Sequence, residues 1–412
     1  MIRRPTWASG SDRLLTGTRF IGGFGEFDVP DRSALREALS IILAAGPRTR
    51  IGLQPRKSRR LWRNTSVLPP VFELPDDVAA GTLAGMMEYG RGHSEAWHPL
   101  KIHTSRRHVI LDIDHGLGDG RFGMELLEAV FTVIDGDRHP WVEKRGTPLA
   151  LPRAILNTFG RQPGRALTAL RSVAALRYGA QGDPSLAGGE RIAWSPSLAV
   201  GMAHVDASAE AAVEEWRRSN PAKPGSAAVW FYLAREALRA AGTPVQDRTL
   251  FAFDSRRYLA EGQAVKGNFI VGLSVPIGPD DQPQQINSRI RGLIDSGVPL
   301  AGQAALGVRS LIGAHGHMAV APTRRLGVPA DVMYTDLGRI PFLETAPWRD
   351  PDNRTITGLI DPAGPHSLTI LNSRMGPTRN LAISYHDNVF DRSLIDEAAR
   401  YLSEPMQFLP PG

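Results

Sequence analysis

The sequence predicts an α+β protein of two domains, each built on a mixed β-sheet with flanking helices. The 412 residues are too many for one hydrophobic core and suit two domains of roughly 200 residues. Segments with the periods of strands and of helices are mixed in both halves of the chain. Prolines and glycines scattered through residues 136–200 predict a connection. We therefore expect an N-terminal domain at residues 1–140, a connection at 141–190 and a C-terminal domain at 191–412.

The N-terminal half begins with a strand and a helix. Residues 19–29 predict a strand that glycines interrupt. Residues 31–45 predict a helix, with Asp31 or Ser33 as the capping residue at its start. The apolar residues at helical spacing, which we expect to be buried, are Leu35, Ala38, Leu39, Ile42 and Leu43.

The C-terminal half begins near Ile192 and has the same mixture. Helices are predicted at residues 227–241 and 392–402. Strand-like segments are predicted at residues 249–253, 269–276, 334–342, 368–371 and 381–385. The connection before this half contains a basic helical stretch at residues 154–178. Its arginines suit either a membrane surface or a solvated helix face, and we favour the solvated face; they are Arg161, Arg165, Arg171 and Arg177.

The composition excludes several classes of function. Without cysteine the chain has no disulfide, no thiolate metal site and no acyl-cysteine intermediate. The start of the chain has no apolar signal core, and its apolar runs are far shorter than the roughly 20 residues that span a bilayer. We therefore expect a cytoplasmic protein without integral membrane association. Only five of the 48 basic residues are lysine, which indicates a GC-rich genome rather than a nucleic-acid surface.

Residues 56–63, RKSRRLWR, form the densest basic cluster. A solvated hairpin edge is the simpler interpretation. A docking surface for a phosphate-bearing cofactor or carrier is the alternative. No RNA- or DNA-binding motif accompanies the cluster, so we expect no nucleic-acid partner.

The glycine-rich stretch DHGLGDG, residues 114–120, is the main candidate for chemistry. Residues 107–114 alternate between apolar and polar and predict a strand. From Gly120 onward the apolar residues have a 3.6-residue period and predict a helix. The stretch therefore connects a strand to a helix, and three interpretations compete.

A metal-binding loop fits this stretch poorly. An EF-hand loop starting at Asp112 needs an oxygen ligand at its fifth position, glycine at its sixth and glutamate at its twelfth. The chain has Gly116, Leu117 and Gly123 there. No HExxH pair accompanies it, and the two histidines in residues 315–317 lack partner acids at a set distance. We therefore expect no metal.

A dinucleotide-binding turn is the second interpretation, because residues 118–123 read GxGxxG before a helix. That fingerprint needs a helix and a second strand before an acidic residue about 20 positions on. Here Asp135 and Asp137 follow the helix too closely. Residues 114–117 also separate the strand from the first glycine of the pattern. The fit is again poor.

The third interpretation takes His115 and Asp119 as a functional pair. A histidine between a strand and a helix start lies near the positive end of the helix dipole, which favours the neutral imidazole that a general base needs. Asp119 at the head of the helix would cap it, and an ion pair with an arginine would fix the loop. The three glycines of the loop would give the backbone room to turn. A structural or merely exposed histidine is the alternative.

Several segments, in order, resemble the HxxxDG acyltransferase superfamily. HGLGDG at residues 115–120 matches HxxxDG itself. DSRRYL at 254–259 and GNF at 267–269 are similar to its D-x-R segment and Gly-Asn pair. YTDLGR at 334–339 resembles the S-N-x-G segment, and residues 381–387 resemble the closing strand and turn. The superfamily includes chloramphenicol acetyltransferase, plant BAHD acyltransferases, mycobacterial polyketide-associated acyltransferases and nonribosomal peptide condensation domains.

The resemblance implies two chloramphenicol-acetyltransferase-like domains with an active-site tunnel at their interface. It implies His115 as the general base and Arg256 as the ion-pair partner of Asp119, with Gly120 completing the motif. The Thr335 hydroxyl would be an oxyanion donor. Acyl-CoA or a phosphopantetheinyl carrier would be a co-substrate, with no tightly bound cofactor and no cofactor-binding residue assigned.

The expected function is that of a monomeric acyltransferase in secondary-metabolite or lipid biosynthesis, acting on a small-molecule hydroxyl or amine. The alternatives are a free-standing condensation enzyme that forms an amide from an acyl or peptidyl carrier protein, and a catalytically silent binding module of the same fold. Asp114 stands where condensation domains have the first of two histidines, which weakens the kinship with peptide-forming members. Thr335-Asp336 replaces Ser-Asn, and the DFGWG motif of plant members is absent.

Overall fold

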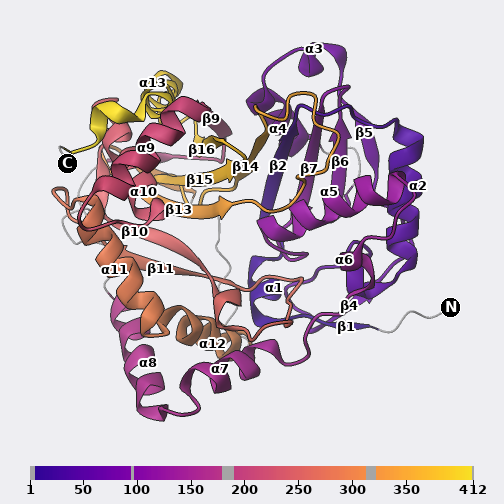
Figure 1. The fold of residues 1–412 in the computed structure, drawn as a ribbon, viewed down its shortest axis with the longest axis horizontal. Helices are drawn as coiled ribbons and strands as arrows, with labels where there is room; N and C mark the ends of the chain where they lie inside the picture. Colours follow the sequence, from indigo (N-terminus) through magenta and orange to yellow (C-terminus); the bar gives the residue numbers. More distant parts are fainter. Residues whose placement is uncertain (1–4, 94–96, 179–189, 312–321, 411–412) are drawn as a thin grey trace.

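The protein consists of two α+β halves that lie side by side, each built on a mixed sheet (Figure 1). The structure is a computed structural model that describes residues 5–93, 97–178, 190–311 and 322–410. The predicted α+β class with mixed sheets is confirmed.

The N-terminal sheet has five strands in the order β14–β2–β7–β6–β5. Only β5 and β6 run parallel, and the other neighbours are antiparallel. The strands are β2 (Arg19–Gly25), β5 (Val71–Glu73), β6 (Leu100–Thr104), β7 (His108–Asp114) and β14 (Thr355–Ile360). One face is covered by α2 (Arg32–Ala44) and α5 (Gly120–Ile134), and the other by α4 (Leu83–Gly92), which follows the short α3 (Asp76–Ala79).

The C-terminal sheet has six strands in the order β11–β10–β13–β15–β16–β9. Strand β13 runs parallel to both its neighbours, while the remaining pairs are antiparallel. The strands are β9 (Leu198–Val205), β10 (Val245–Asp254), β11 (Ile270–Pro276), β13 (Ala330–Arg339), β15 (Ser367–Met375) and β16 (Thr378–His386). The surrounding helices are α7 (Ala150–Phe159), α8 (Pro163–Tyr178), α9 (Ala207–Ser219), α10 (Ser226–Ala240), α11 (Pro283–Asp295), α12 (Val298–Leu311) and α13 (Arg392–Ser403).

Short elements complete the fold below the two sheets and at their ends. A small sheet has the order β1–β4–β3, and β8 pairs with β12. Their bounds are β1 (Thr6–Trp7), β3 (Leu53–Gln54), β4 (Leu61–Asn64), β8 (Arg191–Ala193) and β12 (Thr323–Arg325). The remaining helices are α1 (Gly10–Leu15), α6 (Pro140–Glu143), η1 (Pro47–Thr49), η3 (Ser255–Tyr258) and η4 (Pro405–Phe408).

Local sequence signals predicted the regular elements well. The helix expected at 31–45 is α2, and the side chain of Asp31 accepts a hydrogen bond from the N–H of Ala34 (2.8 Å) as its cap. All five of its predicted apolar positions are buried. The strand expected at 107–114 is β7 and the helix from Gly120 is α5. The basic stretch at 154–178, by contrast, is two helices, because α7 ends before Gly160 and α8 starts at Pro163.

Two segments cross the boundaries that the sequence suggested. Strand β14, from the C-terminal half, pairs with β2 and completes the N-terminal sheet. Helices α7 and α8, from the expected connection, place Ala154, Phe159, Ala169 and Val173 in the core of the C-terminal half. The N-terminal sheet therefore includes a strand from beyond residue 190, and the C-terminal core includes residues from the expected connection.

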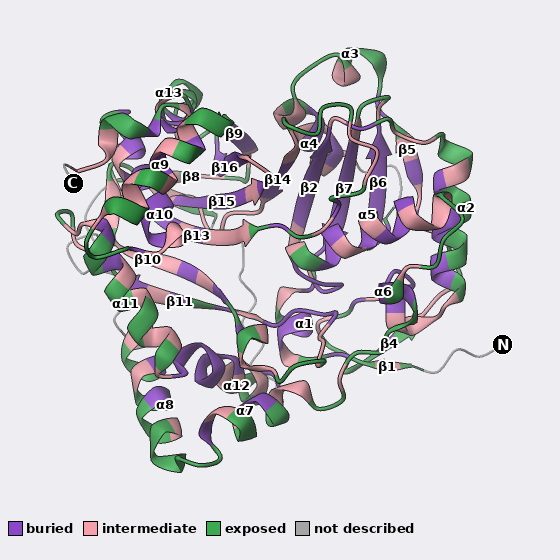
Figure 2. Cartoon of the chain, in the orientation of Figure 1, coloured by how far each residue is buried: buried purple, intermediate pink, exposed green. Residues whose placement is uncertain are grey.

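The two halves meet at a shared apolar core. Side chains from α4, β2 and β7 pack there against side chains from β9, β15 and β16, including Met87, Ile110 and Val200. Figure 2 shows the strands β2, β6 and β7 of the N-terminal sheet and β15 of the C-terminal sheet largely in purple, the colour of buried residues. Within the described residues, no helix combines the length and apolar character needed to cross a membrane.

Candidate active site

His115 is the first residue after β7 and lies where the two halves meet. Its backbone N–H donates to the carbonyl of Thr18 (2.8 Å), and its carbonyl accepts from Nδ2 of Asn268 in the C-terminal half (2.6 Å). The ring packs edge-on against Phe20 of β2, with 5.2 Å between centroids. Nδ1 is buried and has no hydrogen-bond partner among the described residues. Nε2 is therefore the ring nitrogen that can meet a substrate.

Asp12 of α1, which the sequence did not single out, connects this loop to the C-terminal half. Its Oδ1 accepts from the backbone N–H (2.9 Å) and Nδ2 (3.0 Å) of Asn268. Its Oδ2 lies 3.1 Å from Nη2 of Arg50. Arg50 in turn donates to the carbonyls of Leu117 (2.5 Å) and Gly116 (3.1 Å). The carbonyls of three successive loop residues are thus held by groups from both halves.

The signals for these contacts were present but incomplete. Ser9 and Asp12 form a capping box at the start of α1, so a short helix was predictable there. Only the family resemblance pointed to the Gly-Asn pair at 267–268. That Asp12, Arg50 and Asn268 meet at the loop depends on long-range folding, which no local pattern encodes.

Asp114, which replaces the first histidine of condensation domains, closes the turn. Its Oδ1 accepts from the N–H of Gly116 (2.8 Å) and its Oδ2 from the N–H of Gly17 (3.1 Å). Burial raises the pKa of this carboxyl, against the opposing effect of the two hydrogen bonds. A neutral histidine ring has one acceptor nitrogen, so it could not accept both of these hydrogen bonds. Asp114 therefore has a structural role that a histidine would not fill.

Close packing explains two of the loop glycines. None of Gly116, Gly118 and Gly120 has a positive φ. A Cβ at Gly116 would lie 2.4 Å from Oγ1 of Thr16, and one at Gly118 would lie 2.4 Å from the Cβ of Phe122. At Gly120 the nearest atom would be a leucine methyl carbon 3.4 Å away, which is an ordinary contact. The turn therefore needs the room that glycine gives at Gly116 and Gly118, as expected, whereas at Gly120 a Cβ would fit.

Asp119 and Arg256 form the ion pair that the resemblance implies. Oδ2 of Asp119 lies 2.8 Å from Nη1 of Arg256, and both side chains are largely buried. Arg256 also donates to the carbonyls of Val265 (3.1 Å) and Gly267 (2.7 Å). Asp119 occupies the N-cap position of α5, but its side chain accepts no hydrogen bond from the helix because the carboxylate turns toward Arg256. The expected side-chain cap is therefore wrong, and the pair instead bridges the two halves.

Thr335 lies half-buried on β13, in the strand that borders the loop. Two residues further on, Leu337 is the side chain nearest to Gly120. The contacts of the described residues include no hydrogen bond between the Thr335 hydroxyl and His115. The neighbouring Asp336 faces the other side of the strand, where burial raises its pKa and Oδ1 accepts from the N–H of Gly338 (2.6 Å). The oxyanion role of Thr335 stays a prediction.

The basic cluster at 56–63 is the connection of the β3–β4 hairpin and the start of β4. Its four arginines are exposed, whereas Trp62 is buried and donates from Nε1 to two carbonyls of the same connection. The carbonyl of Lys57 accepts from Nε of Arg13 (3.2 Å) on α1, the helix that carries Asp12. The cluster therefore lies on an exposed hairpin edge against α1, which is compatible with both interpretations.

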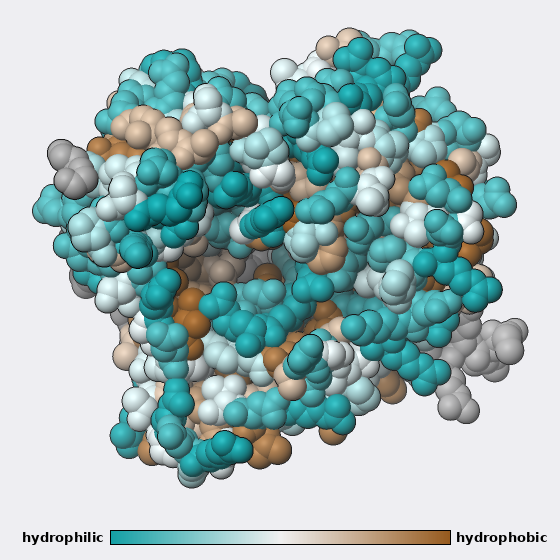
Figure 3. Space-filling model, viewed as in Figure 1, coloured by the Kyte–Doolittle hydropathy of each residue, from teal (hydrophilic) through white to brown (hydrophobic). Residues whose placement is uncertain are grey.

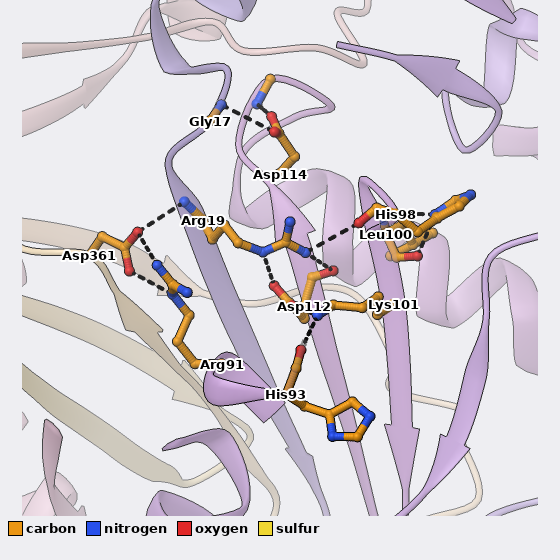
Figure 4. A network of polar contacts seen from close by, with 11 residues as sticks. Gly17, Arg19, Arg91, His93, His98, Leu100, Lys101, Asp112, Asp114 and Asp361 are labelled. Carbon is orange, nitrogen blue, oxygen red and sulfur yellow. Dashed lines mark hydrogen bonds and ion pairs between the residues drawn. The ribbon is translucent and has the colours of Figure 1, made fainter. Parts of the chain in front are cut away.

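A second polar network connects the inserted strand β14 to the N-terminal sheet (Figure 4). Asp112 is fully buried between Arg19 and Lys101, whose Nζ lies 2.9 Å from it. Asp361, which directly follows β14, accepts two hydrogen bonds from Arg91 of α4 (2.9 and 3.0 Å) and one from the N–H of Arg19 (3.3 Å). The described residues contain no group of three or more histidine, aspartate or glutamate side chains arranged for a metal ion.

Four histidines recur every five residues in the sequence, at positions 93, 98, 103 and 108, and they take part in packing. His98 and His103 are buried, and His93 and His108 are partly buried. Burial lowers the pKa of His98, His103 and His108, and that of His103 falls to about 3. The pair at 315 and 317 lies outside the described residues.

The surface view shows a hollow between the two halves on the face that it displays (Figure 3). The hollow lies over the region where the N-terminal and C-terminal sheets face each other. That it continues past His115 as a tunnel remains a prediction.

No family model matches the sequence, and no curated protein matches it by sequence similarity. The structure, however, matches solved structures over nearly its full length. One is trichothecene 15-O-acetyltransferase from Fusarium sporotrichioides, with a TM-score of 0.65, 11% identity, and coverage of 98% of this chain and 95% of that chain. The chain has the chloramphenicol acetyltransferase-like fold.

Two further solved structures match over nearly the full length of the chain. Polyketide synthase associated protein 5 from Mycobacterium tuberculosis matches with a TM-score of 0.58 and 16% identity, over 99% of both chains. The first condensation domain of the calcium-dependent antibiotic synthetase matches with a TM-score of 0.58 and 14% identity, over 97% of both chains. At these identities the likeness shows the fold alone, and the predicted resemblance is confirmed at that level.

Proposed function

We propose that the protein is an acyltransferase that moves an acyl group from a phosphopantetheine thioester to a hydroxyl or amine acceptor. The observation that carries this proposal is the setting of His115. Its ring has one buried nitrogen and one available nitrogen, and its backbone is held by contacts from both halves. The imidazole of His115 is therefore held in position, and no described ion pair occupies its available nitrogen, as proton transfer requires.

The proposed reaction takes place in one ternary complex. Nε2 of His115 removes the proton from the acceptor as its oxygen or nitrogen attacks the thioester carbonyl carbon. The tetrahedral intermediate then collapses, the carbon–sulfur bond breaks, and the thiolate leaves with the proton that the imidazolium returns. A thiolate is a good leaving group, so positioning and one base supply most of the acceleration.

The negative oxygen of the intermediate needs a hydrogen-bond donor. The Thr335 hydroxyl or backbone N–H groups are the candidates. Asp119 and Arg256 would act at a distance by fixing the loop, and Gly120 would start the helix behind it. No covalent acyl-enzyme is invoked, in agreement with the absence of cysteine and of a G-x-S-x-G elbow.

The donor in this proposal is acyl-CoA or an acyl carrier protein, since both contain phosphopantetheine and phosphate. The exposed arginines of the β3–β4 hairpin support such a donor by their charge and by their contact with α1. Charge reversal at Arg56 and Arg59 should raise the apparent KM for the donor while kcat stays near its normal value. An unchanged KM would remove the hairpin from the donor site.

Amide formation is the second candidate, because a condensation domain matches the fold as well as a polyketide-associated protein does. The same base would then deprotonate an amine, with an acyl or peptidyl carrier protein as donor. A silent binding module is the third, and the intact set of His115, Asp119 and Arg256 speaks against it. Secondary-metabolite or lipid biosynthesis in the cytoplasm is the proposed setting.

The test is direct. The purified protein is incubated with a panel of acyl thioesters and with hydroxyl or amine acceptors, and products are detected by mass spectrometry. An ester or amide that needs both substrates and active protein supports the proposal and distinguishes its two forms. Hydrolysis without an acceptor would contradict the ternary mechanism.

A further inference from the structure

The helix pair α7–α8 presents leucines on a face that the other described residues leave exposed. Its inner face supplies buried residues to the core of the C-terminal half. On the outer face four leucines keep large exposed fractions, namely 74%, 69%, 53% and 43% at Leu149, Leu156, Leu167 and Leu170. Single exposed apolar residues are normal on protein surfaces, so their arrangement decides what they mean.

These leucines lie along the two helices. Leu149 is the N-cap residue of α7 and has a left-handed backbone (φ 52°), so it precedes the helix, whereas Leu156 is exposed on α7 itself. On α8, Leu167 and Leu170 are three residues apart and share the exposed face with Ala174. The apolar inner face of α8 already accounts for its packing against the core. A second apolar stripe on the solvent side is unexplained by the fold.

The charge of this segment is strongly one-sided. Residues 144–178 contain no aspartate or glutamate and have seven basic residues, which exceeds the net charge of +6 of the whole chain. The basic residues are Lys144, Arg145, Arg153, Arg161, Arg165, Arg171 and Arg177. The four arginines from Arg153 to Arg171 are exposed, and among the described residues they bind only a glutamine side chain and a main-chain carbonyl, both through Arg165. These cations are therefore directed at solvent, not at counter-charges on the protein.

Helix α12 lies on the inner side of the two helices. It packs against both of them, and a Cβ at Gly307 would lie 3.6 Å from Leu151 of α7. Beyond that contact, Val308 is 58% exposed and the adjacent Arg309 is also exposed. Helices α7 and α8 form the lower edge of the molecule in Figure 1, with α12 above them, and Figure 3 shows hydrophobic side chains along that edge.

We propose that the outer face of α7–α8 binds the surface of an anionic phospholipid bilayer. Leucines interleaved with arginines on a protruding helical face match the way interfacial helices bind: apolar side chains enter the boundary between headgroups and acyl chains, and cations contact lipid phosphates. The two helices lie at the outer edge of the molecule in Figure 1, where an extended bilayer can contact both of them. The proposal is independent of acyl transfer and reverses the sequence-based preference for a merely solvated helix face.

The experiment measures binding of the full chain to vesicles. Co-sedimentation with phosphatidylcholine vesicles, with and without phosphatidylglycerol, should show binding only to the anionic vesicles, and added salt should weaken it. The double variant Leu156→Glu/Leu167→Glu should bind about tenfold more weakly, because two apolar anchors are lost and two negative charges face the lipid. Leu394→Glu on α13 is the matched control, since it changes an exposed leucine on another part of the surface and should bind normally.

All these positions are exposed, so the variants should fold, and circular dichroism with thermal unfolding verifies this. The proposal is overturned if the wild-type chain does not bind phosphatidylglycerol vesicles, or if the double variant binds them as the wild type does. Capture of an acidic carrier protein without vesicle binding would also overturn it. Vesicle binding without any acyl transfer would instead contradict the proposed function alone.

Discussion

The replacement Asp119→Asn isolates the ion pair between the HxxxDG loop and the C-terminal half. Asparagine keeps the size of the side chain and one hydrogen-bond acceptor but removes the charge. Arg256 would then stay buried with its positive charge, because its side chain is only 9% exposed. Its remaining partners would be two main-chain carbonyls and Asp254 at 3.3 Å.

The expected cost follows from this burial. Breaking a buried ion pair on one side costs about 3–5 kcal/mol in free energy of unfolding. The remaining contacts of Arg256 favour the lower end, so we expect a loss of about 3 kcal/mol. For a domain of this size each kcal/mol lowers the unfolding midpoint by about 2–4 °C, which gives about 6–12 °C in total. Turnover should fall as well, because the loop that holds His115 loses its ion pair with Arg256 in the C-terminal half.

Chemical denaturation of Asp119→Asn, Arg256→Gln and the double variant measures the coupling energy of the pair. The double variant should cost much less than the sum of the single variants. Asp254→Asn is the matched control: Asp254 is 47% exposed and should cost less than about 1 kcal/mol. A wild-type unfolding midpoint for Asp119→Asn, or strict additivity, would refute the assigned role of this pair.

Three further predictions concern the loop and the core. Gly116→Ala should lower stability and turnover, since its Cβ would meet Oγ1 of Thr16 at 2.4 Å, whereas Gly120→Ala should fold normally; thermal unfolding compares the two, and equal midpoints would contradict the packing argument. Asn268→Ala should lower kcat more than it changes KM, because Nδ2 of Asn268 holds the carbonyl of His115 in place. Steady-state kinetics measures both constants, and an unchanged kcat would contradict this role. The pKa of His103 is about 3 in the folded protein and 6.5 in the unfolded chain. As the pH drops below 6.5, the unfolded chain therefore binds a proton that the folded protein does not. The free energy of unfolding should fall by about 2 kcal/mol at pH 5. Denaturation at pH 7 and pH 5 should show that His103→Phe removes this part of the loss, and an unchanged loss would disprove it.

Elements that depend on local periodicity could be predicted from the sequence. The buried face of α2 was predicted residue by residue, because helical spacing alone decides which side chains face the sheet. The joint between β7 and α5 was predicted for the same reason, and it located His115 correctly in the fold.

Contacts between distant parts of the chain could not be predicted in this way. Asp12 is separated from Asn268 by 256 residues, and nothing in either segment reveals the other. Strand β14 gave no sign that it would join the N-terminal sheet, since strand patterns specify a face and not a partner. The ion pair of Asp119 and Arg256 was expected only because of the resemblance.

The split of the basic stretch into α7 and α8 was missed for a local reason. Gly160 and Pro163 end one helix and start the next, but the apolar positions on both sides continue with helical spacing. The exposed leucines also repeat with that spacing, so the sequence could not tell which stripe faces the core.

The central claim is that His115 moves the proton during acyl transfer. Its most direct test is the turnover of His115→Ala with a donor and acceptor that the wild-type protein converts, measured by mass spectrometry of the product. The ring is half-buried, and among the described residues its aromatic contact is with Phe20, so the variant should unfold near the wild-type midpoint. We expect product formation to fall to the uncatalysed background. Full turnover by a folded His115→Ala variant would contradict the account.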